Sequence, residues 1–415
     1  MNRFRSIPHG VLIVLTTIQF AASGCASEGA RGELEWVAEW DTVGDTVIVH
    51  TISGSMWGQP REMEAVLSIG VLDGAEELMF GSLQQIAVDD DGSIYAFDGQ
   101  VPALRRFDAA GAYVGTIGRD GAGPGEYQSF ATGLAIRSDG KMVLLDPQNT
   151  RINVYEPDGT HFAHWPVQGG FFSRQGLVVD AEDHTYVQIL TGTFASDEPL
   201  PTGYLHLSAN GATIDTIVPP RFPGEPKAAT FRPFGPSKVL GMTPFGHLIV
   251  GMNDDYRFDI RSPDGTVVRV ERDYEPVALL SDEKADWQAI YDWFDENQPF
   301  GEIGSVPDYK PPYAQFLSAQ DGRIWVRRRA EGYKEEEEEE PQSEESNQPP
   351  PMNWEEQSIY DVFELDGTYL GEVRFPLRAS PLFVRADTAW GVYRGEFDEQ
   401  YIAKLVMNRA ERSAP

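Results

Sequence analysis

The stretch Leu134–Gly159, LAIRSDGKMVLLDPQNTRINVYEPDG, sets the pattern for the chain after residue 80. It contains two short apolar runs around an Asp-Gly turn, a corner with Asp146 and Arg151, and a third apolar run before a second Asp-Gly turn. Short apolar runs bounded by turn residues are typical of antiparallel β-strands. The stretch therefore predicts three strands joined by tight turns.

The same order of runs and turns recurs along the chain. The first-turn glycines Gly92 and Gly140 are 48 residues apart, and so are the second-turn glycines Gly111 and Gly159. Looser copies follow and give six units, each with three or four short strands. One such unit cannot bury its apolar face alone, so repeated units stack around an axis. The sequence therefore predicts an all-β fold, a six-bladed β-propeller of four-stranded antiparallel blades, over residues 35–410.

The two ends of the repeat array predict how the ring closes. The sixth unit has no visible fourth strand. Glu35–Ser53 precedes the first unit and is rich in β-branched residues, which favour strands. A further short strand is expected between Trp57 and Ile69. We expect the N-terminal strand of Glu35–Ser53 to complete blade six.

Units one and two resemble NHL repeats over Leu83–Trp165. The resemblance rests on an apolar strand, an Asp-Gly turn, a strand that ends in Asp, an Asn-x-Arg corner and a second Gly turn. Gly118–Tyr127, GRDGAGPGEY, resembles the glycine-rich linker that joins such blades. Unit one departs from the pattern, because Ala103 stands where unit two has Arg151. The resemblance implies a propeller, and beyond residue 174 it is a resemblance of architecture only.

Strand order assigns the connections between strands to two faces. Strands A to D of a blade run outward from the axis, so the A–B and C–D turns share one face and the B–C and D–A connections share the other. The second face receives every long insertion, and long loops on a rigid scaffold often carry function. We therefore expect binding at the B–C/D–A face, with the candidate residues Asp98, Arg119, Asp146, Arg151, Trp287 and Trp293. Alternatively, Asp146 and Arg151 brace their own corner through a charge-assisted hydrogen bond.

Two insertions on this face have a distinct composition. Ser281–Asn297 predicts a helix, because Ser281 can cap it and Trp287, Ile290 and Phe294 recur at helical spacing. Its tryptophans either form an aromatic platform for glycans or peptides or dock the helix onto the propeller. Residues 331–356 carry 11 acidic residues against one Lys and show no apolar period, which predicts a disordered loop.

The N-terminus has the features of an export signal. Arg3 and Arg5 precede the apolar run Val11–Ala22, and small residues lead to Cys25, the only cysteine of the chain. This segment resembles the lipobox of bacterial lipoproteins, in which the cysteine is acylated and becomes the mature N-terminus. Ala22 stands where that family most often has Leu. The alternative is an ordinary cleaved signal followed by an unmodified cysteine.

The resemblance to lipoproteins implies a cellular location for the protein. We expect a signal peptide over residues 1–24, lipid attachment at Cys25 and a tether over residues 25–34. Acyl chains would anchor the protein in the cell envelope, at the outer membrane or the periplasmic side. The formal net charge of −32 disfavours nucleic acid and anionic membrane surfaces as direct partners. The expected partner is an envelope protein or a glycan.

Residues with catalytic or metal-binding chemistry do not form a recognisable pattern in the sequence. His161 and His164 fall on opposite faces of a strand, and His184 and His247 follow the A–B turns of different units. We therefore predict no catalytic residue, no metal ligand and no cofactor, and the favoured function is binding. The alternative function is a calcium-dependent hydrolase or lyase of the lactonase or esterase kind, because resembling six-bladed propellers include such enzymes. Those enzymes hold calcium at the ends of their inner strands, which here begin with apolar or small residues.

Overall fold

The computed structural model describes residues 35–408 except 131–132, 168–175, 194, 196, 229, 298–301 and 336–347. The described residues belong to one unit of the chain, Leu34–Pro415. The expected signal peptide, Cys25 and the whole of the tether lie outside the described residues. In the described part of the chain, no helix is long and apolar enough to span a membrane.

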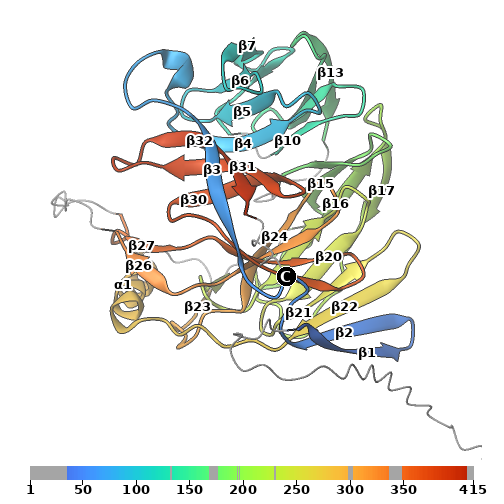
Figure 1. Ribbon diagram of the computed structural model, residues 1–415, viewed down its shortest axis with the longest axis vertical. Coiled ribbons are helices and arrows are strands. Elements are labelled where there is room, and N and C mark those ends of the chain that lie inside the picture. Colours follow the sequence, from blue (N-terminus) through green and yellow to red (C-terminus); the bar gives the residue numbers. More distant parts are fainter. Residues whose placement is uncertain are drawn as a thin grey trace, which may run out of the picture. The chain divides into compact units, whose positions relative to one another are not determined.

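The first three blades are each built from four consecutive antiparallel strands, as the repeat predicts (Figure 1). Blade one consists of β4 (Leu83–Val88), β5 (Ile94–Asp98), β6 (Ala103–Phe107) and β7 (Tyr113–Ile117). Blade two consists of β10 (Gly133–Ile136), β11 (Met142–Asp146), β12 (Arg151–Tyr155) and β13 (His161–Pro166). Blade three consists of β14 (Val178–Val179), β15 (Thr185–Leu190), β16 (Thr202–Leu207) and β17 (Thr213–Ile217). The turn glycines Gly92 and Gly140 have φ angles of 84° and 78°, which glycine adopts without steric cost.

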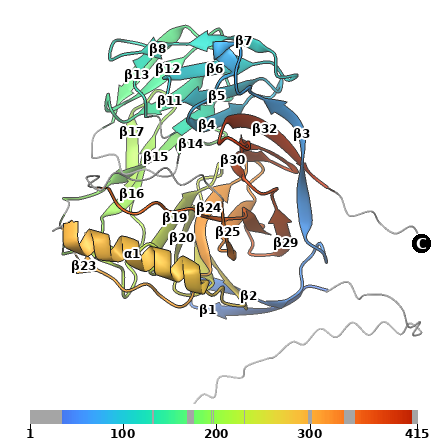
Figure 2. The same cartoon turned by 90° about the vertical axis from the view of Figure 1, so that its left-hand side faces the viewer.

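The other three blades complete the expected number of six. Blade four consists of β19 (Lys238–Met242), β20 (Leu248–Met252), β21 (Arg257–Arg261) and β22 (Val267–Arg272). Blade five consists of β24 (Tyr313–Ser318), β25 (Ile324–Arg328), β28 (Ile359–Phe363) and β29 (Tyr369–Arg374). Blade six consists of β30 (Ala379–Arg385), β31 (Thr388–Arg394), β32 (Gln400–Met407) and, as its outer strand, β3 (Arg61–Ile69). Figure 2 shows β4, β14, β19, β24 and β30 nearest the centre of the ring.

The N-terminal strands correct one expectation about ring closure. The strand that completes blade six is β3, which pairs antiparallel with β32, whereas Glu35–Ser53 was expected there. Instead, β1 (Val37–Val43) and β2 (Thr46–Ser53) form a hairpin, and β2 adds in parallel to β22 at the outer edge of blade four. The physical reason is chain length. Because β3 directly precedes blade one, residues 70–82 suffice to lead from the outer strand of blade six to the inner strand of blade one.

Apolar side chains pack in clusters between neighbouring blades. Phe97 and Leu144 meet between blades one and two, and Trp325 and Leu405 meet between blades five and six. Similar clusters lie between blades two and three, three and four, and four and five. Trp390 of blade six joins the core of blade one. The ring is therefore closed by side-chain packing as well as by β3.

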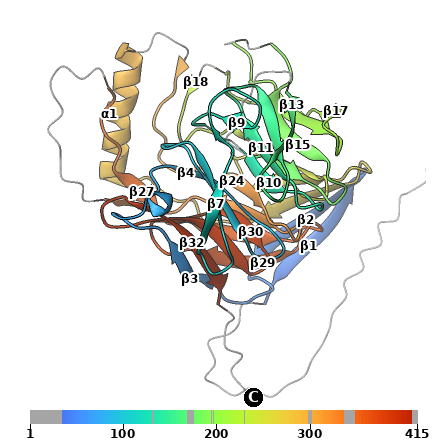
Figure 3. The ribbon, with the colours of Figure 1, turned by 90° about the horizontal axis from the view of Figure 1, so that it is seen from above.

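The elements outside the blades gather on the B–C/D–A face, as the sequence predicts. They are α1 (Ser281–Asn297), the pair β18 (Thr230–Phe231) and β23 (Glu302–Ile303), and the pair β26 (Gly332–Lys334) and β27 (Trp354–Glu356). We call this group the loop platform; Figures 1 and 3 both place α1 beside β27. The ends of the 331–356 insertion are thus paired rather than disordered, and its middle part, 336–347, lies outside the described residues.

Two further short elements precede and follow blade one. The 3-10 helix η1 (Glu76–Leu78) lies between β3 and β4. The pair β8 (Arg119–Asp120) and β9 (Glu126–Tyr127) lies within the glycine-rich linker to blade two. The linker is therefore a folded segment that can support neighbouring side chains.

Candidate functional site

A cavity of about 760 Å³ lies at the centre of the ring. The inner strands of all six blades contribute to its wall, and its lining continues onto A–B turns such as Asp89–Asp91 and Ser138–Gly140. Its volume falls in the range of about 300–1,000 Å³ that is typical of small-ligand sites. The candidate site is therefore the central channel, and its mouth lies among the tight A–B turns, opposite the face that the loop lengths predict.

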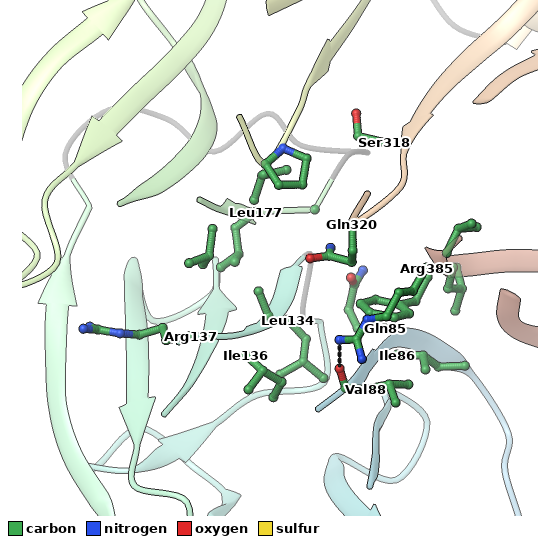
Figure 4. Close-up of a pocket in the computed structure, with 18 of the residues that line it drawn as sticks. Gln85, Ile86, Val88, Leu134, Ile136, Arg137, Leu177, Ser318, Gln320 and Arg385 are labelled. Carbon is green, nitrogen blue, oxygen red and sulfur yellow. Dashed lines mark hydrogen bonds between the residues drawn. The ribbon is translucent and has the colours of Figure 1, made fainter. Parts of the chain in front are cut away.

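Apolar and amide side chains both line the channel (Figure 4). Leu134 and Leu177, from blades two and three, line one side. Gln85 of blade one and Gln315 and Ser318 of blade five contribute polar groups. Among the described residues, the side chains of these three have no hydrogen-bond partner, so they are available to a ligand or to water. Small-molecule sites commonly combine apolar side chains with polar groups that orient the ligand.

The charged side chains at the channel mouth are largely engaged with the protein. Arg385 donates hydrogen bonds to the carbonyl oxygens of Val88, at 2.8 Å, and Asp89, at 3.1 Å (Figure 4). The Tyr95 hydroxyl donates to the Asp89 carboxylate at 3.1 Å, and burial, together with the charge of Asp89, raises the pKa of Tyr95 to about 12. Tyr95 is therefore neutral and a donor at physiological pH. Since Asp90 and Asp91 are exposed beside it, the mouth disfavours anions.

The predicted rim residue Asp98 is buried at the B–C corner of blade one, with 1% of its surface exposed. Its carboxylate accepts hydrogen bonds from the backbone N–H groups of Gly81, at 3.2 Å, and Ser82, at 3.0 Å. Arg105 lies 3.4 Å from the same carboxylate. Asp98 therefore fixes the start of the inner strand and leaves little capacity for a ligand.

The predicted pair Asp146 and Arg151 braces the linker between blades one and two. Asp146 is 1% exposed and accepts a hydrogen bond of 2.7 Å from the Asn149 side chain. Arg151 lies 3.7 Å from Asp146 and donates to the carbonyl oxygens of Gly123 and Glu126, both at 2.7 Å. This arrangement matches the alternative in which Asp146 and Arg151 brace their own corner. At 3.7 Å, the contact between the two charges is an ion pair rather than a hydrogen bond.

Arg119 is the one strongly exposed residue of the predicted rim. Its side chain is 80% exposed, and its guanidinium contacts the Glu126 carboxylate at 2.6 Å. That contact and backbone hydrogen bonds lower the pKa of Glu126 from its usual value, the hydrogen bond from Gly123 first among them. Arg119 is accessible to a partner, and Glu126 links it to Arg151, which donates to the Glu126 carbonyl oxygen at 2.7 Å, whereas the two tryptophans belong to a distant part of the chain.

The predicted tryptophans of α1 are half-buried. Trp287 packs edge-to-face against Phe234, and Trp293 packs in the same way against Phe294, each at 5.1 Å between ring centroids. Tyr291, 1% exposed, faces the same cluster. The helix is thus docked, which was the second of the two alternatives.

A buried charge cluster holds α1 against the rest of the loop platform. The Lys310 side chain is fully buried and contacts the carboxylates of Glu283, at 2.7 Å, and Glu356, at 3.0 Å. About one turn further along the same side of α1, Asp286 accepts a hydrogen bond of 2.8 Å from the Trp354 indole. The loop platform is therefore a built structure in which the helix and the acidic insertion share contacts.

One cluster of potential ligand residues was missed in the sequence. Asp180, His184 and His206 of blade three offer ligand atoms that all lie within 4.8 Å of one another. His184 and His206 are 22 residues apart, the first directly before β15 and the second on β16, so their spacing is not that of a recognisable motif. The available signal was the repeat itself, because Tyr186 lies opposite His206 just as Tyr95 lies opposite Arg106 in blade one.

Comparisons with known proteins agree with the architecture. A family model described as a 6-bladed beta-propeller, DUF5128, matches residues 65–171. A solved structure of a DUF4221 family member from Bacteroides vulgatus is 11% identical, covers 85% of this chain and 99% of its own, and has a TM-score of 0.50. Virginiamycin B lyase from Staphylococcus aureus is 8% identical over 90% of this chain and 99% of its own, with a TM-score of 0.39.

A third structure in this group is the calcium-binding protein regucalcin from Agrobacterium tumefaciens. It is 10% identical over 83% of this chain and 95% of its own, with a TM-score of 0.38. A search of curated proteins found no match. Similarities at these identities carry no activity over to this chain. The family match and the closed ring of six blades identify the chain as a six-bladed β-propeller.

Proposed function

We propose that the protein is a cell-envelope lipoprotein that binds a neutral ligand in its central channel. The observation that supports this most directly is that apolar and amide side chains line one cavity. A ligand suited to this lining has an apolar face and a hydrogen-bonding edge, as a sugar unit or a short uncharged peptide of an envelope partner does. The acidic mouth and the net charge of −32 argue against anionic ligands.

Two kinds of side chain would recognise the ligand. Leu134 and Leu177 would bury the apolar face of the ligand, and each buried CH₂ group contributes about 0.8 kcal/mol. Gln85 and Gln315 would supply both donors and acceptors, so they read the polar edge of the ligand. A polar ligand group left unpaired in the channel would cost about 1–3 kcal/mol, which makes these amides the specificity elements.

Channel variants test this function. We would screen a panel of neutral oligosaccharides and a panel of uncharged tripeptides by saturation-transfer NMR, and then measure the affinity of any binder. Gln85→Leu and Gln315→Leu should each weaken binding by about tenfold or more, because a similar volume is kept while the amide is lost. Gln288→Leu, on the exposed side of α1, is the matched control and should bind normally. A ligand whose affinity is unchanged by both channel variants would exclude the channel as its site.

The lipid anchor is tested separately. The support for it is the run Ala22-Ser23-Gly24 directly before Cys25. In a Gram-negative host, Cys25→Ala should move the protein from the membrane fraction to the soluble fraction, while Ser27→Ala should leave it at the membrane. Membrane association that survives Cys25→Ala would rule out the anchor.

A protein partner on the loop platform is a second candidate function. It is favoured by the contacts of Asp286 and Lys310, which hold α1 and the acidic insertion together on one face. Asp295→Lys, which reverses an exposed charge of α1, should weaken capture of a partner from envelope extracts and leave ligand binding in the channel unchanged. If both functions fell together in this variant, the two surfaces would not be independent.

A calcium-dependent hydrolase or lyase is the alternative of a different class. Thermal unfolding distinguishes it from a binding protein. A stoichiometric rise in melting temperature with Ca²⁺ that Mg²⁺ does not reproduce would favour the enzyme. Equal and small effects of the two ions would leave the binding proposal as the better account.

A further inference from the structure

Two histidines and one aspartate meet at the tight-turn end of blade three. Asp180 lies in the A–B turn, His184 follows it, and His206 lies on β16. The Nδ1 atom of His184 is 3.3 Å from Nε2 of His206 and 3.5 Å from Oδ2 of Asp180. We propose that these three side chains form a binding site for a divalent transition-metal ion of the Zn²⁺ type. The site shares Asp180 with the cavity lining but none of the side chains proposed to contact the neutral ligand, so it does not depend on that proposal.

The distances agree with those of a shared ion. Zn²⁺ binds histidine nitrogen and carboxylate oxygen at about 2.0–2.2 Å, and tetrahedral geometry then places neighbouring ligand atoms about 3.3 Å apart. The two separations above, 3.3 and 3.5 Å, are close to this length, and the third lies within 4.8 Å. Two histidines and one carboxylate form a donor set that is found in zinc sites, and a water molecule or another group takes the fourth position. Hard ions such as Mg²⁺ and Ca²⁺ prefer all-oxygen sites, so the imidazoles select against them.

A second layer of residues orients two of the proposed ligands. The Asp215 carboxylate contacts Nδ1 of His206 at 3.1 Å, which leaves Nε2 of that ring to face His184. Carboxylates bonded to the far nitrogen of a ligand histidine fix its tautomer and raise its basicity. Tyr186 donates a hydrogen bond of 3.0 Å to Oδ2 of Asp180, and its ring stacks on His206 at 4.4 Å. Both side chains are thus held in place before an ion arrives.

Blade one shows which residues stand at the corresponding positions when they have a structural role only. Asp89 and Tyr95 repeat the contact of Asp180 and Tyr186, with a hydrogen bond of 3.1 Å. In blade one, however, the position of His184 is taken by Ser93 and that of His206 by Arg106, which donates to the Ser93 hydroxyl at 3.3 Å. The arginine places a fixed positive charge where blade three has two imidazoles. The Asp–Tyr contact is therefore shared by blades one and three, whereas the two histidines are special to blade three.

Blade four supplies a matched histidine without the other ligands. His247 follows its A–B turn as His184 does, but Thr243 stands at the position of Asp180 and Ile260 pairs with the strand where blade three has His206. One imidazole beside a hydroxyl is not a site for a transition metal. His247 is consequently the natural control for any test of the blade-three cluster.

The proposed ion would lie at the edge of the channel mouth. Asp180 contributes to the cavity lining, and the Glu182 carboxylate, 79% exposed, lies 3.7 Å from Nδ1 of His184. The Glu182 carboxylate is therefore close enough to take the fourth coordination position of the ion. If it does not, that position is open to solvent. An ion held here would add a positive charge to an otherwise acidic mouth.

Zinc and cobalt binding test the proposal. Untagged, chelator-treated and dialysed protein would be titrated with Zn²⁺ in excess Mg²⁺, which occupies carboxylate-only sites, against a chromogenic chelator. We expect one equivalent of tightly bound Zn²⁺, and with Co²⁺ the intense visible absorption of a tetrahedral site. His184→Gln and His206→Arg should weaken binding at least about hundredfold, and Asp215→Asn about 10–100-fold. His247→Gln should bind as the unmodified protein does.

His206→Arg also keeps the test independent of folding. It copies the arrangement of blade one, with an arginine beside the tyrosine, so the metal-free variant should melt at the same temperature as the unmodified protein. If it does not fold, His184→Gln decides the matter, because this side chain is partly exposed. Absence of stoichiometric Zn²⁺ binding by the unmodified protein, or equal binding by His184→Gln, would overturn the proposal. Neither result would affect the channel, since its ligand contacts are different residues.

Discussion

At the scale of single residues, the buried carboxylate of Asp361 is the most consequential group for stability. It is fully buried, accepts hydrogen bonds of 2.7 Å from the hydroxyls of both Tyr256 and Tyr369, and lies 3.2 Å from Arg272. Asp361→Asn leaves the arginine without its counter-charge. We expect the free energy of unfolding in urea to fall by about 3–5 kcal/mol.

The control for Asp361 is the exposed Asp366 in the following turn of the same blade. Its carboxylate accepts the backbone N–H of Thr368 at 2.9 Å, and the side-chain oxygen of an asparagine can accept that bond as well. Asp366→Asn should therefore change the free energy of unfolding by less than about 0.5 kcal/mol. Equal losses in the two variants would mean that Asp361 contributes no more than a surface carboxylate.

Individual site residues were only partly predictable from the sequence. The Asp146 and Arg151 corner was recognisable because both residues stand at fixed positions of the repeat, and the structural reading of it followed from the same fact. Gln85 and Gln315 do not stand at such fixed positions. The sequence alone does not show whether a glutamine in a strand faces the channel or the solvent. His184 and His206 are neighbours only because β15 pairs with β16, and the register of that pairing cannot be predicted from either segment alone.

At the scale of elements, the acidic insertion predicts two different outcomes for two deletions. Deleting residues 336–347 leaves β26 and β27 in place, so the free energy of unfolding should change by less than about 0.5 kcal/mol. Deleting residues 333–354 also removes Glu335, which accepts hydrogen bonds of 2.7 and 3.1 Å from Arg378, and the Trp354 contact to Asp286. This larger deletion should cost about 1–3 kcal/mol. Urea unfolding of both variants checks the difference, and equal effects would show that the paired ends do not stabilise the platform.

Elements with strong local patterns were predicted well, and those defined by distant contacts were not. The helix 281–297 has an acidic first turn and a helical apolar spacing, and α1 has the same bounds. The ends of the acidic insertion have no local period. They are ordered by partners from elsewhere, such as Lys310 for Glu356. Composition alone therefore extended the disordered segment too far.

At the scale of the whole molecule, the period of 48 residues predicted the blades, but the closure of the ring required a contact between chain ends. The sequence indicated that blade six lacks a strand and that N-terminal strands were available. Both β2 and β3 are suitable candidates by composition. Packing decides between them, because Met63 and Ile69 of β3 are 3% and 4% exposed and contribute to the cores on either side of blade six.

The closing strand β3 therefore predicts how the ring unfolds. Met63→Ala removes packing between blades five and six, and Ile69→Ala removes packing between blades six and one. Each should lower the free energy of unfolding by about 2–5 kcal/mol, whereas Val66→Ala, at a position 59% exposed in the same strand, should cost less than about 0.5 kcal/mol.

The m value of the urea transition reports whether the six blades unfold together. It scales with the surface exposed on unfolding, so a ring that opens as one unit keeps the same m value when β3 is weakened. We expect Met63→Ala to shift the midpoint and leave the m value unchanged, because blade six shares apolar cores with both of its neighbours and cannot separate without exposing them. A second transition or a smaller m value in this variant would instead show that the ring opens at β3 first. The pairing of β3 with β32 would then be the least stable contact between parts of the propeller.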